Sequence, residues 1–283
     1  MQAGSRKREE APATGRTYAR SIARGLFCAP VEIPEGPPTM KLLLTSNGIT
    51  NPSIERALVE MLGKPIAESR VLIVLSGIYP FPGGVNYAYQ MLHGQIGGPL
   101  AALGWASVGL LELTALPSIS REAWVPTLEE VDALLVWGGH PHYIAYWMRE
   151  SGLTALLPTL RPEMVYVGVS GGSIAAAAFF GETYLGLPGT IAKPLTTEEV
   201  AFTVPEGDLM LTFATAEGAG LVDFAIIPHY AEPDHREASV VNAPVWAAKL
   251  PGQVYALDDQ SAVRMVDGVV DVVSEGRWEL FPH

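Results

Sequence analysis

Short apolar segments alternate with helix-like segments along most of this 283-residue chain, and this alternation restricts the fold more than any other feature. Residues 71–75 (Val-Leu-Ile-Val-Leu) are apolar at every position, as expected of a strand buried on both faces of a parallel sheet. Similar apolar segments occur at residues 41–45, 107–113, 133–137, 164–169 and 224–227. Helical spacing of apolar residues follows several of them, and Asn51-Pro52 is a typical helix start. The pattern predicts a core of βαβ units.

The last part of the chain has a different pattern. Residues 254–257, 262–266 and 269–273 are short strand candidates, and Asp267-Gly268 between the last two favours a hairpin turn. This pattern predicts antiparallel strands near the C-terminus. Residues 237–250 suit a helix that Pro244 interrupts, and residues 183–219 are interpreted as a long insertion or active-site loop because their periodicity is weak.

Composition excludes several classes of protein. The chain is 48% hydrophobic and has a formal net charge of −12, so general binding to nucleic acid or to an anionic membrane surface is not expected. No uninterrupted apolar run reaches the roughly 18 residues that a membrane span requires. The single cysteine, Cys28, has no partner for an internal disulfide. We expect a soluble cytoplasmic protein.

Residues 1–39 differ from the rest in charge. They carry a net charge of +2, whereas residues 40–283 carry −14. A disordered N-terminal extension is the favoured interpretation. The alternatives are an Arg-rich targeting peptide, in which Glu9 and Glu10 are unusual, and a secretory signal, for which the apolar stretch is missing. Residues 40–283 are expected to form a single α/β domain.

The most informative motif is Gly168-Val169-Ser170-Gly171-Gly172, which matches Gly-x-Ser-x-Gly. An apolar strand candidate precedes it and an alanine-rich helix candidate follows. In this setting the serine lies on a sharp strand-to-helix turn that exposes its hydroxyl at the carboxyl edge of the sheet. The Gly171 amide would then lie at a helix N-terminus, where it could donate to an oxyanion. A plain turn with small residues is the alternative.

A nucleophilic serine needs a base, and His229 is the favoured histidine. It follows the apolar segment 224–227 and so is expected at the carboxyl edge of the sheet, where ligands bind in open α/β folds. His93, His140 and His142 lie in loop or turn candidates, and His283 is terminal. His235 is nearby, but residues 234–237 are interpreted as a solvated helix start.

The remaining parts of a hydrolytic site also follow strand candidates. Asp258 and Asp259 come after residues 254–257, and either could orient the imidazole. Gly138 and Gly139 come after residues 133–137 and are candidates for the second oxyanion donor, because glycine allows close backbone approach.

These motifs together resemble the peptidase E (aspartyl dipeptidase) and cyanophycinase family of serine peptidases. The resemblance rests on Lys-Leu-Leu-Leu-Thr-Ser-Asn-Gly, a strand ending in Gly-Gly, Gly-x-Ser-x-Gly, Pro-His-Tyr and Ala-Leu-x-Asp-x-Ser, in that order from Met40 onward. It implies a three-layer sandwich with a mostly parallel central sheet, like that of class I glutamine amidotransferases and flavodoxin. It further implies Ser170 as nucleophile, His229 as base, Asp259 as acid, and Gly138 and Gly139 at the oxyanion hole.

Several positions depart from the family pattern. Gly171 stands where alanine is common, His140 follows the glycine pair where asparagine is usual, and Gln260 stands where glycine is common. Aspartyl dipeptidases need a cation for the substrate carboxylate, for which Arg236 and Lys193 are candidates, and His140 is a further candidate for substrate contact. Asp-X specificity is not predicted.

The resemblance predicts a serine peptidase of dipeptidase or exopeptidase type that hydrolyses small peptides and uses no cofactor or metal. One alternative is an α/β-hydrolase esterase that uses Asp208 or Asp223 with His283, because that fold has the chain order Ser, Asp, His. The other is an inactive binding protein on an amidotransferase-like fold. A homodimer is a candidate assembly.

Overall fold

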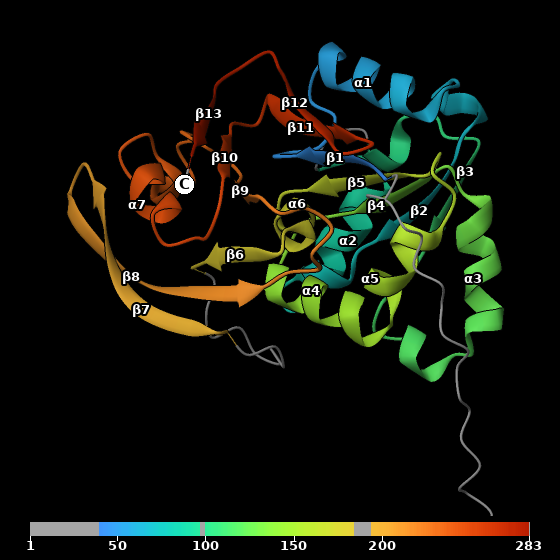
Figure 1. Cartoon of the computed structure of the whole chain (residues 1–283), viewed down its shortest axis with the longest axis horizontal. Helices are drawn as coiled ribbons and strands as arrows, with labels where there is room; N and C mark the ends of the chain where they lie inside the picture. Colours follow the sequence, from blue (N-terminus) through green and yellow to red (C-terminus); the bar gives the residue numbers. More distant parts are fainter. Residues whose placement is uncertain (1–39, 97–99, 184–193, 283) are drawn as a thin grey trace, which may run out of the picture. The chain divides into compact units, whose positions relative to one another are not determined.

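A computed structural model describes residues 40–96, 100–183 and 194–282, so the expectation for residues 1–39 lies outside the described residues. The central sheet (Figure 1) contains β1 (Lys41–Thr45), β2 (Arg70–Val74), β3 (Ser107–Leu110), β4 (Ala133–Val136), β5 (Val165–Val169), β11 (Ser261–Val266) and β12 (Val269–Ser274). Its strand order is β12-β11-β1-β5-β4-β2-β3. The five strands from β1 to β3 in this order pair in parallel, whereas β11 and β12 are antiparallel.

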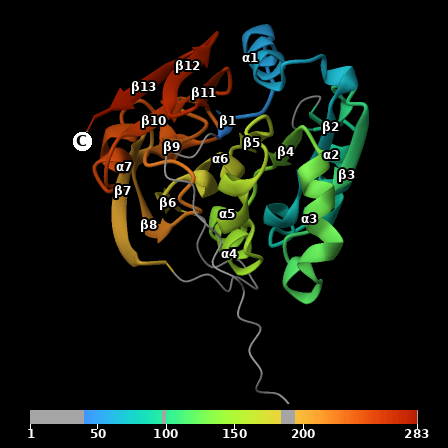
Figure 2. The ribbon, with the colours of Figure 1, turned by 45° about the vertical axis from the view of Figure 1, so that its right-hand side comes forward.

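Helices cover both faces of this sheet. One face carries α1 (Pro52–Leu62) and α2 (Gly84–Leu92), and the other carries α3 (Arg121–Glu130), α4 (Pro141–Glu150), α5 (Leu153–Leu156) and α6 (Gly171–Ala176). Successive strand residues point to opposite faces, so Leu42 and Leu43 of β1 are both fully buried but belong to different core clusters. Figure 2 shows the helices on both sides of the strands. The predicted α/β three-layer sandwich with a mostly parallel sheet is confirmed.

The start of α1 follows the local chemistry of the sequence. The Asn51 side chain accepts hydrogen bonds from the amides of Ser53 and Ile54, and Pro52 occupies the first helical position, where no amide is needed. The helix ends at Gly63, whose φ of 69° is a left-handed conformation that glycine adopts readily. The segment from Ser46 to Asn51, which precedes this helix, follows β1 at the carboxyl edge of the parallel strands.

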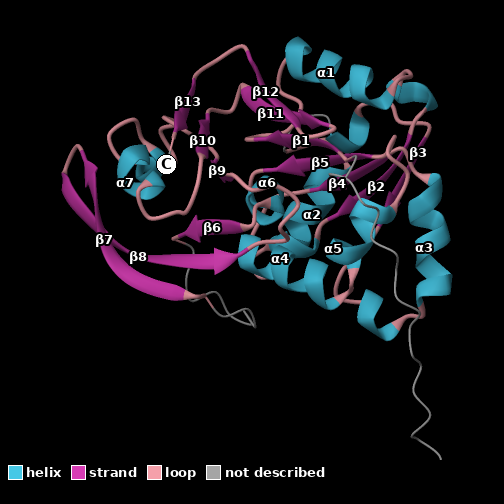
Figure 3. Ribbon diagram, viewed as in Figure 1, coloured by secondary structure: helices cyan, strands magenta, loops and turns pink. Residues whose placement is uncertain are grey.

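One predicted strand lies in a different sheet. Residues 224–227 were expected to extend the parallel sheet, but β9 (Ala225–Ile227) pairs in parallel with β10 (Val254–Leu257), and β10 pairs with β13 (Trp278–Phe281). One edge of β1 pairs with β5 and the other pairs with β11, so β9 cannot pair with β1. The three strands form a second, smaller sheet (Figure 3).

The interpretation of residues 183–219 as a loop is wrong for the described part. β7 (Thr196–Val204) and β8 (Gly207–Glu217) form a long antiparallel hairpin, and β6 (Phe179–Glu182) pairs with β8. Most β7 side chains are exposed, which is why the sequence shows little hydrophobic alternation. The buried Phe202 and Phe213 pack against Trp246 with ring centroids 6.2 and 5.4 Å away.

The helix expected over residues 237–250 is much shorter than predicted. A single 3-10 turn, η6 (Arg236–Ala238), precedes α7 (Ala243–Ala247), and Pro244 lies in the first turn of α7. Proline lacks the amide that a continuous helix would use, so it starts this helix instead of lying within it. Among the helices of the described residues, none combines the length and the apolar character needed to cross a membrane.

Candidate active site

Ser170 lies on the sharp turn between β5 and α6. Its backbone has φ 48° and ψ −113°, a conformation that is costly for a residue with a side chain. The turn is fixed to the end of β1, because the Ser170 amide donates to the Thr45 carbonyl (3.1 Å) and Ser173 Oγ donates to the same oxygen (2.7 Å). Thr45 Oγ1 in turn donates to the Gly168 carbonyl (2.8 Å). The predicted elbow is therefore present, held by a neighbouring strand.

The glycines around Ser170 allow two turns to approach closely. A Cβ at Gly171 would lie 2.3 Å from the Gly139 carbonyl oxygen, and a Cβ at Gly172 would lie 1.9 Å from the Val136 carbonyl oxygen. Gly139 has φ 114° and leaves no room for a side chain, since its Cβ would lie 2.2 Å from the Gly77 oxygen. The turn containing Gly138 and Gly139 thus packs directly on the elbow. The two predicted oxyanion donors, Gly139 and Gly171, therefore lie in adjoining turns.

His229 lies beside Ser170, although β9 is not in the central sheet. Its Nε2 is 2.8 Å from Ser170 Oγ and its Nδ1 is 2.7 Å from Asp259 Oδ1. The His229 backbone has φ 56°, and its amide donates to Ser46 Oγ (2.7 Å), which holds the residue in this uncommon conformation. The structure therefore brings together three residues from segments far apart in the sequence.

Of the two aspartates left open by the sequence, Asp259 contacts His229 and Asp258 does not. Asp258 is buried and accepts hydrogen bonds from Ser261 Oγ (2.5 Å), the Gln260 amide (3.0 Å) and the Arg277 amide. Asp258 thus holds the turn and the start of β13 together. Its neighbour Asp259 is left to face the histidine.

The electrostatic setting of Asp259 favours its charged form. Burial raises the pKa of the carboxyl, but the hydrogen bond and charge of His229, with the hydrogen bond from Ser46, outweigh burial and hold that pKa below its usual value. Asn47 Nδ2 donates to the second carboxylate oxygen (2.9 Å). A charged acceptor of this kind orients an imidazole with its Nδ1 proton toward the carboxylate.

Sequence reasoning missed the roles of Ser46 and Asn47. Ser46 Oγ donates to Asp259 Oδ1 (3.2 Å) while it accepts from the His229 amide, so one hydroxyl contacts both residues. In the sequence, Ser46 and Asn47 stand out only as part of the Lys-Leu-Leu-Leu-Thr-Ser-Asn-Gly motif, and no role was assigned to either. Their position directly after a parallel strand, at the edge where Ser170 was expected, is the signal that could have identified them.

A small cavity of about 30 Å³ adjoins Ser170 and His229. The residues that line it come from the elbow, the Gly139 turn, β6, the segment after β9, and α7: Gly139, Ser170, Gly171, Ile174, Glu182, Thr183, Pro228, His229, His235, Glu237, Ala238 and Trp246. The wall includes two acidic residues, Glu182 and Glu237. Among the described residues, no lysine or arginine lines it. The cavity has room for only a small chemical group.

His235 lies in the segment 234–237 expected as a solvated helix start, but its side chain is only 29% exposed. Its ring is stacked on that of His229, with centroids 4.1 Å apart and an interplanar angle of 16°. Its Nδ1 is 3.4 Å from Glu237 Oε1. The hydrogen bond to Glu237 raises the pKa of His235, against burial, and the charges of Glu237, Asp259 and Asp234 raise it further.

Neither Arg236 nor His140, two of the residues predicted to contact substrate, lines this cavity. The Arg236 guanidinium pairs with Glu206, in the turn between β7 and β8. His140 is buried against Phe81 and His142, with ring centroids 6.3 and 5.4 Å away. Lys193, the other candidate cation, lies outside the described residues.

The groups of the esterase alternative are not assembled in the described residues. Asp208 lies on β8, where its carboxylate accepts from Thr203 Oγ1 at 3.5 Å. Asp223 precedes β9, and His283 lies outside the described residues. The Ser170 hydroxyl already has His229 as its partner. Within the described residues, no group of three or more His, Cys, Asp or Glu side chains is arranged to hold a metal ion.

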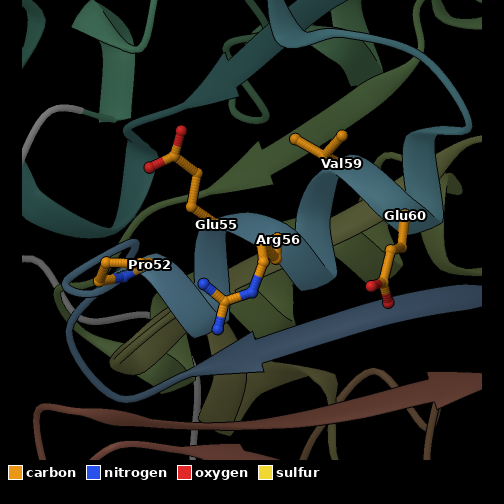
Figure 4. A pocket seen from close by; sticks show the side chains of 5 residues that line it. All are labelled: Pro52, Glu55, Arg56, Val59 and Glu60. Atoms are coloured by element: carbon orange, nitrogen blue, oxygen red, sulfur yellow. The ribbon is translucent and has the colours of Figure 1, made fainter.

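A larger hollow of about 350 Å³ lies on α1, lined by Pro52, Glu55, Arg56, Val59 and Glu60 (Figure 4). All five residues come from one helix, and none belongs to the predicted site. The hollow is open to solvent at exposed side chains, whereas the cavity at Ser170 collects residues from five segments. We therefore take the cavity at Ser170 as the candidate active site.

Two solved structures of other proteins share this fold. A crystal structure of a candidate peptidase E protein from Listeria monocytogenes EGD-e is similar, with a TM-score of 0.57 and 16% identity over 84% of this chain and 99% of that one. A peptidase from an acI-B1 Actinobacterium is also similar, with a TM-score of 0.55 and 16% identity over 86% of this chain and 91% of that one. No curated protein matches this chain in sequence. The model of peptidase family S51 matches residues 42–273, so the chain belongs to this family of serine peptidases.

Proposed function

We propose that this serine peptidase hydrolyses the amide bonds of small peptides, as a dipeptidase or exopeptidase, through Ser170, His229 and Asp259. The observation that carries the proposal is the unbroken line of contacts from Ser170 Oγ through the imidazole to the Asp259 carboxylate, at 2.8 and 2.7 Å. Both distances are those of good hydrogen bonds. We further propose that residues 40–283 act as a single catalytic domain.

The geometry supports acyl transfer to water. Ser170 Oγ attacks the amide carbonyl carbon while its proton moves to His229 Nε2, and the Asp259 carboxylate stabilises the imidazolium. The carbon–nitrogen bond then breaks as Nε2 gives its proton to the departing amine. A water molecule attacks the acyl-enzyme and gives a proton to Nε2. Nε2 then gives this proton to Ser170 Oγ as the bond between Oγ and the acyl carbon breaks. This step releases the carboxylic acid and restores the enzyme.

The oxyanion of each tetrahedral intermediate would be stabilised by the backbone amides of Gly171 and Gly139. Gly171 begins α6, where the first amides have no partner within the helix and the helix dipole favours negative charge. The close approach of the Gly139 turn to the elbow supports its role as the second donor. Preorganised donors of this kind contribute about 3–4 kcal/mol each to the stability of the transition state.

The size of the cavity supports a terminal residue of a short peptide as the group bound beside Ser170. A volume of about 30 Å³ accommodates a small group beside Ser170. Trp246 belongs to this wall and packs against Phe202 and Phe213, so the β7–β8 hairpin supports the cavity from outside. A peptide end presents a smaller group to this cavity than the interior of a chain does.

The proposal is tested with a panel of dipeptides and matching N-acetylated peptides, using Ser170→Ala and Ser118→Ala. Ser118 Oγ bonds only locally to the Ala115 carbonyl, and its residue is exposed, so this variant is the matched control. We expect hydrolysis of free dipeptides, a loss of at least about 10³-fold in Ser170→Ala and no change in Ser118→Ala. A fluorophosphonate should label the wild type at Ser170 alone.

Two results would count against the proposal. Undiminished hydrolysis by a folded Ser170→Ala protein would exclude Ser170 as nucleophile. Faster hydrolysis of the N-acetylated peptides than of the free ones would retain the nucleophile but reject the exopeptidase assignment. Thermal melting of each variant establishes that it is folded.

A further inference from the structure

The three proposed catalytic residues follow strands of two different sheets. Ser170 follows β5 of the central sheet, whereas His229 and Asp259 follow β9 and β10 of the smaller sheet. A serine and its base must keep a fixed separation, because a misplacement of about 1 Å can cost about 10²-fold in rate. The site therefore needs contacts that hold the two sheets in register at this edge.

The end of β1 supplies such contacts to both sides. Thr45 is the last residue of β1, and its carbonyl accepts a hydrogen bond from the Ser170 amide (3.1 Å). Ser46 comes next, and its Oγ accepts from the His229 amide (2.7 Å) and donates to Asp259 Oδ1 (3.2 Å). Two adjacent residues of one strand end thus contact all three proposed catalytic residues.

The Ser46 hydroxyl uses both of its hydrogen-bonding abilities. A backbone amide can only donate, so a lone pair of Ser46 Oγ faces the His229 amide and its single proton is directed to Asp259. Asp259 Oδ1 is also the atom that lies 2.7 Å from His229 Nδ1. Ser46 is completely buried, which shields both bonds from water. One hydroxyl therefore holds the backbone of the base and the oxygen that orients its ring.

The same segment holds the rest of the Asp259 residue. Asn47 Nδ2 donates to Asp259 Oδ2 (2.9 Å), so each carboxylate oxygen has a donor from this segment, and Thr50 Oγ1 donates to the Asp259 carbonyl (2.7 Å). A carboxylate held at both oxygens cannot turn away from the imidazole. Ser46 does not line the cavity beside Ser170, so its side chain is not part of the wall that a substrate group would contact.

We propose that Ser46 is a positioning residue whose hydroxyl aligns His229 and Asp259 with Ser170, and that the rate of the peptidase reaction depends on this alignment. The proposal rests on the proposed roles of those three residues. Without the hydroxyl, the His229 amide loses its acceptor while its backbone has φ 56°, a conformation that is costly for a residue with a side chain. Asp259 loses a donor at the oxygen that orients the ring.

The test compares Ser46→Ala with Ser69→Ala. Ser69 is also completely buried, and its Oγ donates to the Pro65 carbonyl (3.0 Å), but it directly precedes β2 and so lies at the opposite edge of the parallel strands. The first measurement is the rate constant for fluorophosphonate labelling of Ser170, which needs no knowledge of the substrate. The second is kcat and KM for the dipeptide that the wild type hydrolyses fastest.

We expect Ser46→Ala to label about 10- to 100-fold more slowly than the wild type. The value of kcat should fall by a similar factor while KM stays within about twofold, because the lost contacts act on the transition state and not on the cavity wall. Ser69→Ala also loses a buried hydrogen bond, so it should melt at a lower temperature but label at the wild-type rate.

A double-mutant cycle tests whether Ser46 acts through Asp259. In the Asp259→Asn protein the imidazole has already lost its orienting carboxylate, so adding Ser46→Ala should slow labelling by less than about threefold. Effects that are independent would instead multiply, and the full loss of about 10- to 100-fold would appear again.

Labelling at the wild-type rate by folded Ser46→Ala would overturn the proposal, and so would the full loss in the Asp259→Asn background or a rise in KM that accounts for the slower hydrolysis. If Ser46→Ala does not fold, Ser46→Cys replaces it, because a thiol is similar in size but bonds weakly. Failure of both variants to fold would also overturn the proposal, since Ser46 would then serve the fold itself. Labelling that persists in Ser170→Ala would instead reject the proposed function.

Discussion

Neighbouring residues of identical type have different roles at this site because their surroundings differ. Asp258 and Asp259 are adjacent in the turn after β10, yet Asp258 accepts three hydrogen bonds from its own turn and from Arg277, while Asp259 faces His229 and Ser46. A carboxylate whose oxygens are occupied by structural donors stabilises the fold. A carboxylate directed at an imidazole can take part in catalysis.

This difference predicts opposite effects of one chemical change. Asp259→Asn should lower kcat/KM by about 10³- to 10⁴-fold, because an amide favours the wrong tautomer of His229. Asp258→Asn should lower the free energy of unfolding by about 1–3 kcal/mol, because buried donors lose their acceptor, with a much smaller effect on the rate. Peptide hydrolysis and thermal melting of both variants measure this. Similar rate losses in the two variants would contradict the assignment.

At the scale of elements, the site depends on how closely α6 and its elbow approach β4. The turns after β4 and β5 are both glycine-rich, and their backbones are in direct contact. A side chain at Gly171 or Gly172 would force these two turns apart. The Gly-x-Ser-x-Gly pattern and the Gly138-Gly139 pair are thus two halves of one packing arrangement.

Gly172→Ala tests this packing. The added Cβ would lie 1.9 Å from the Val136 carbonyl oxygen, so backbone must shift, and the free energy of unfolding should fall by about 2–3 kcal/mol. The control is Gly104→Ala, where φ is +85° but no atom lies within 4 Å of the new Cβ, and the loss should be about 1 kcal/mol from backbone strain alone. Chemical denaturation measures both losses. Equal losses would show that contact with β4 contributes nothing.

At the scale of the whole molecule, buried histidine links stability to pH. His142, in the first turn of α4, is 3% exposed, and its ring centroid is 5.0 Å from that of Phe180. Burial, followed by the nearby His140 and Arg149, lowers its pKa to about 4. The folded protein therefore holds this ring neutral where an unfolded chain would protonate it.

Because the folded pKa lies below the unfolded value of 6.5, the unfolded state binds more protons between the two. The free energy of unfolding should therefore decrease as the pH falls from about 6.5 to about 4, by up to about 3 kcal/mol from this group. His142→Gln should flatten the dependence over this window, and His93→Phe should not. Urea titrations at several pH values measure the slope. An unchanged slope in His142→Gln would assign the effect to other groups.

Much of the architecture was predictable because it depends on local patterns. Strands apolar on both faces, the Asn51-Pro52 helix start and the Asp267-Gly268 hairpin each involve a few adjacent residues, and each is present in the structure. The β7–β8 hairpin was missed because its strands are largely solvent-exposed and lack alternation. The sheet that receives β9 was also not predictable, since strand pairing depends on which edges remain free.

For the site, the sequence by itself identified Ser170, His229 and Asp259 as candidates, because each directly follows a strand-like segment or lies in a recognisable motif. Only the tertiary structure decided that Asp259 and not Asp258 faces His229, that Ser46 joins the two, and that His235 stacks on the imidazole. The physical reason is the range of the interactions. Strand and turn patterns involve near neighbours, whereas these contacts join residues up to 213 positions apart, and only chain packing brings them together.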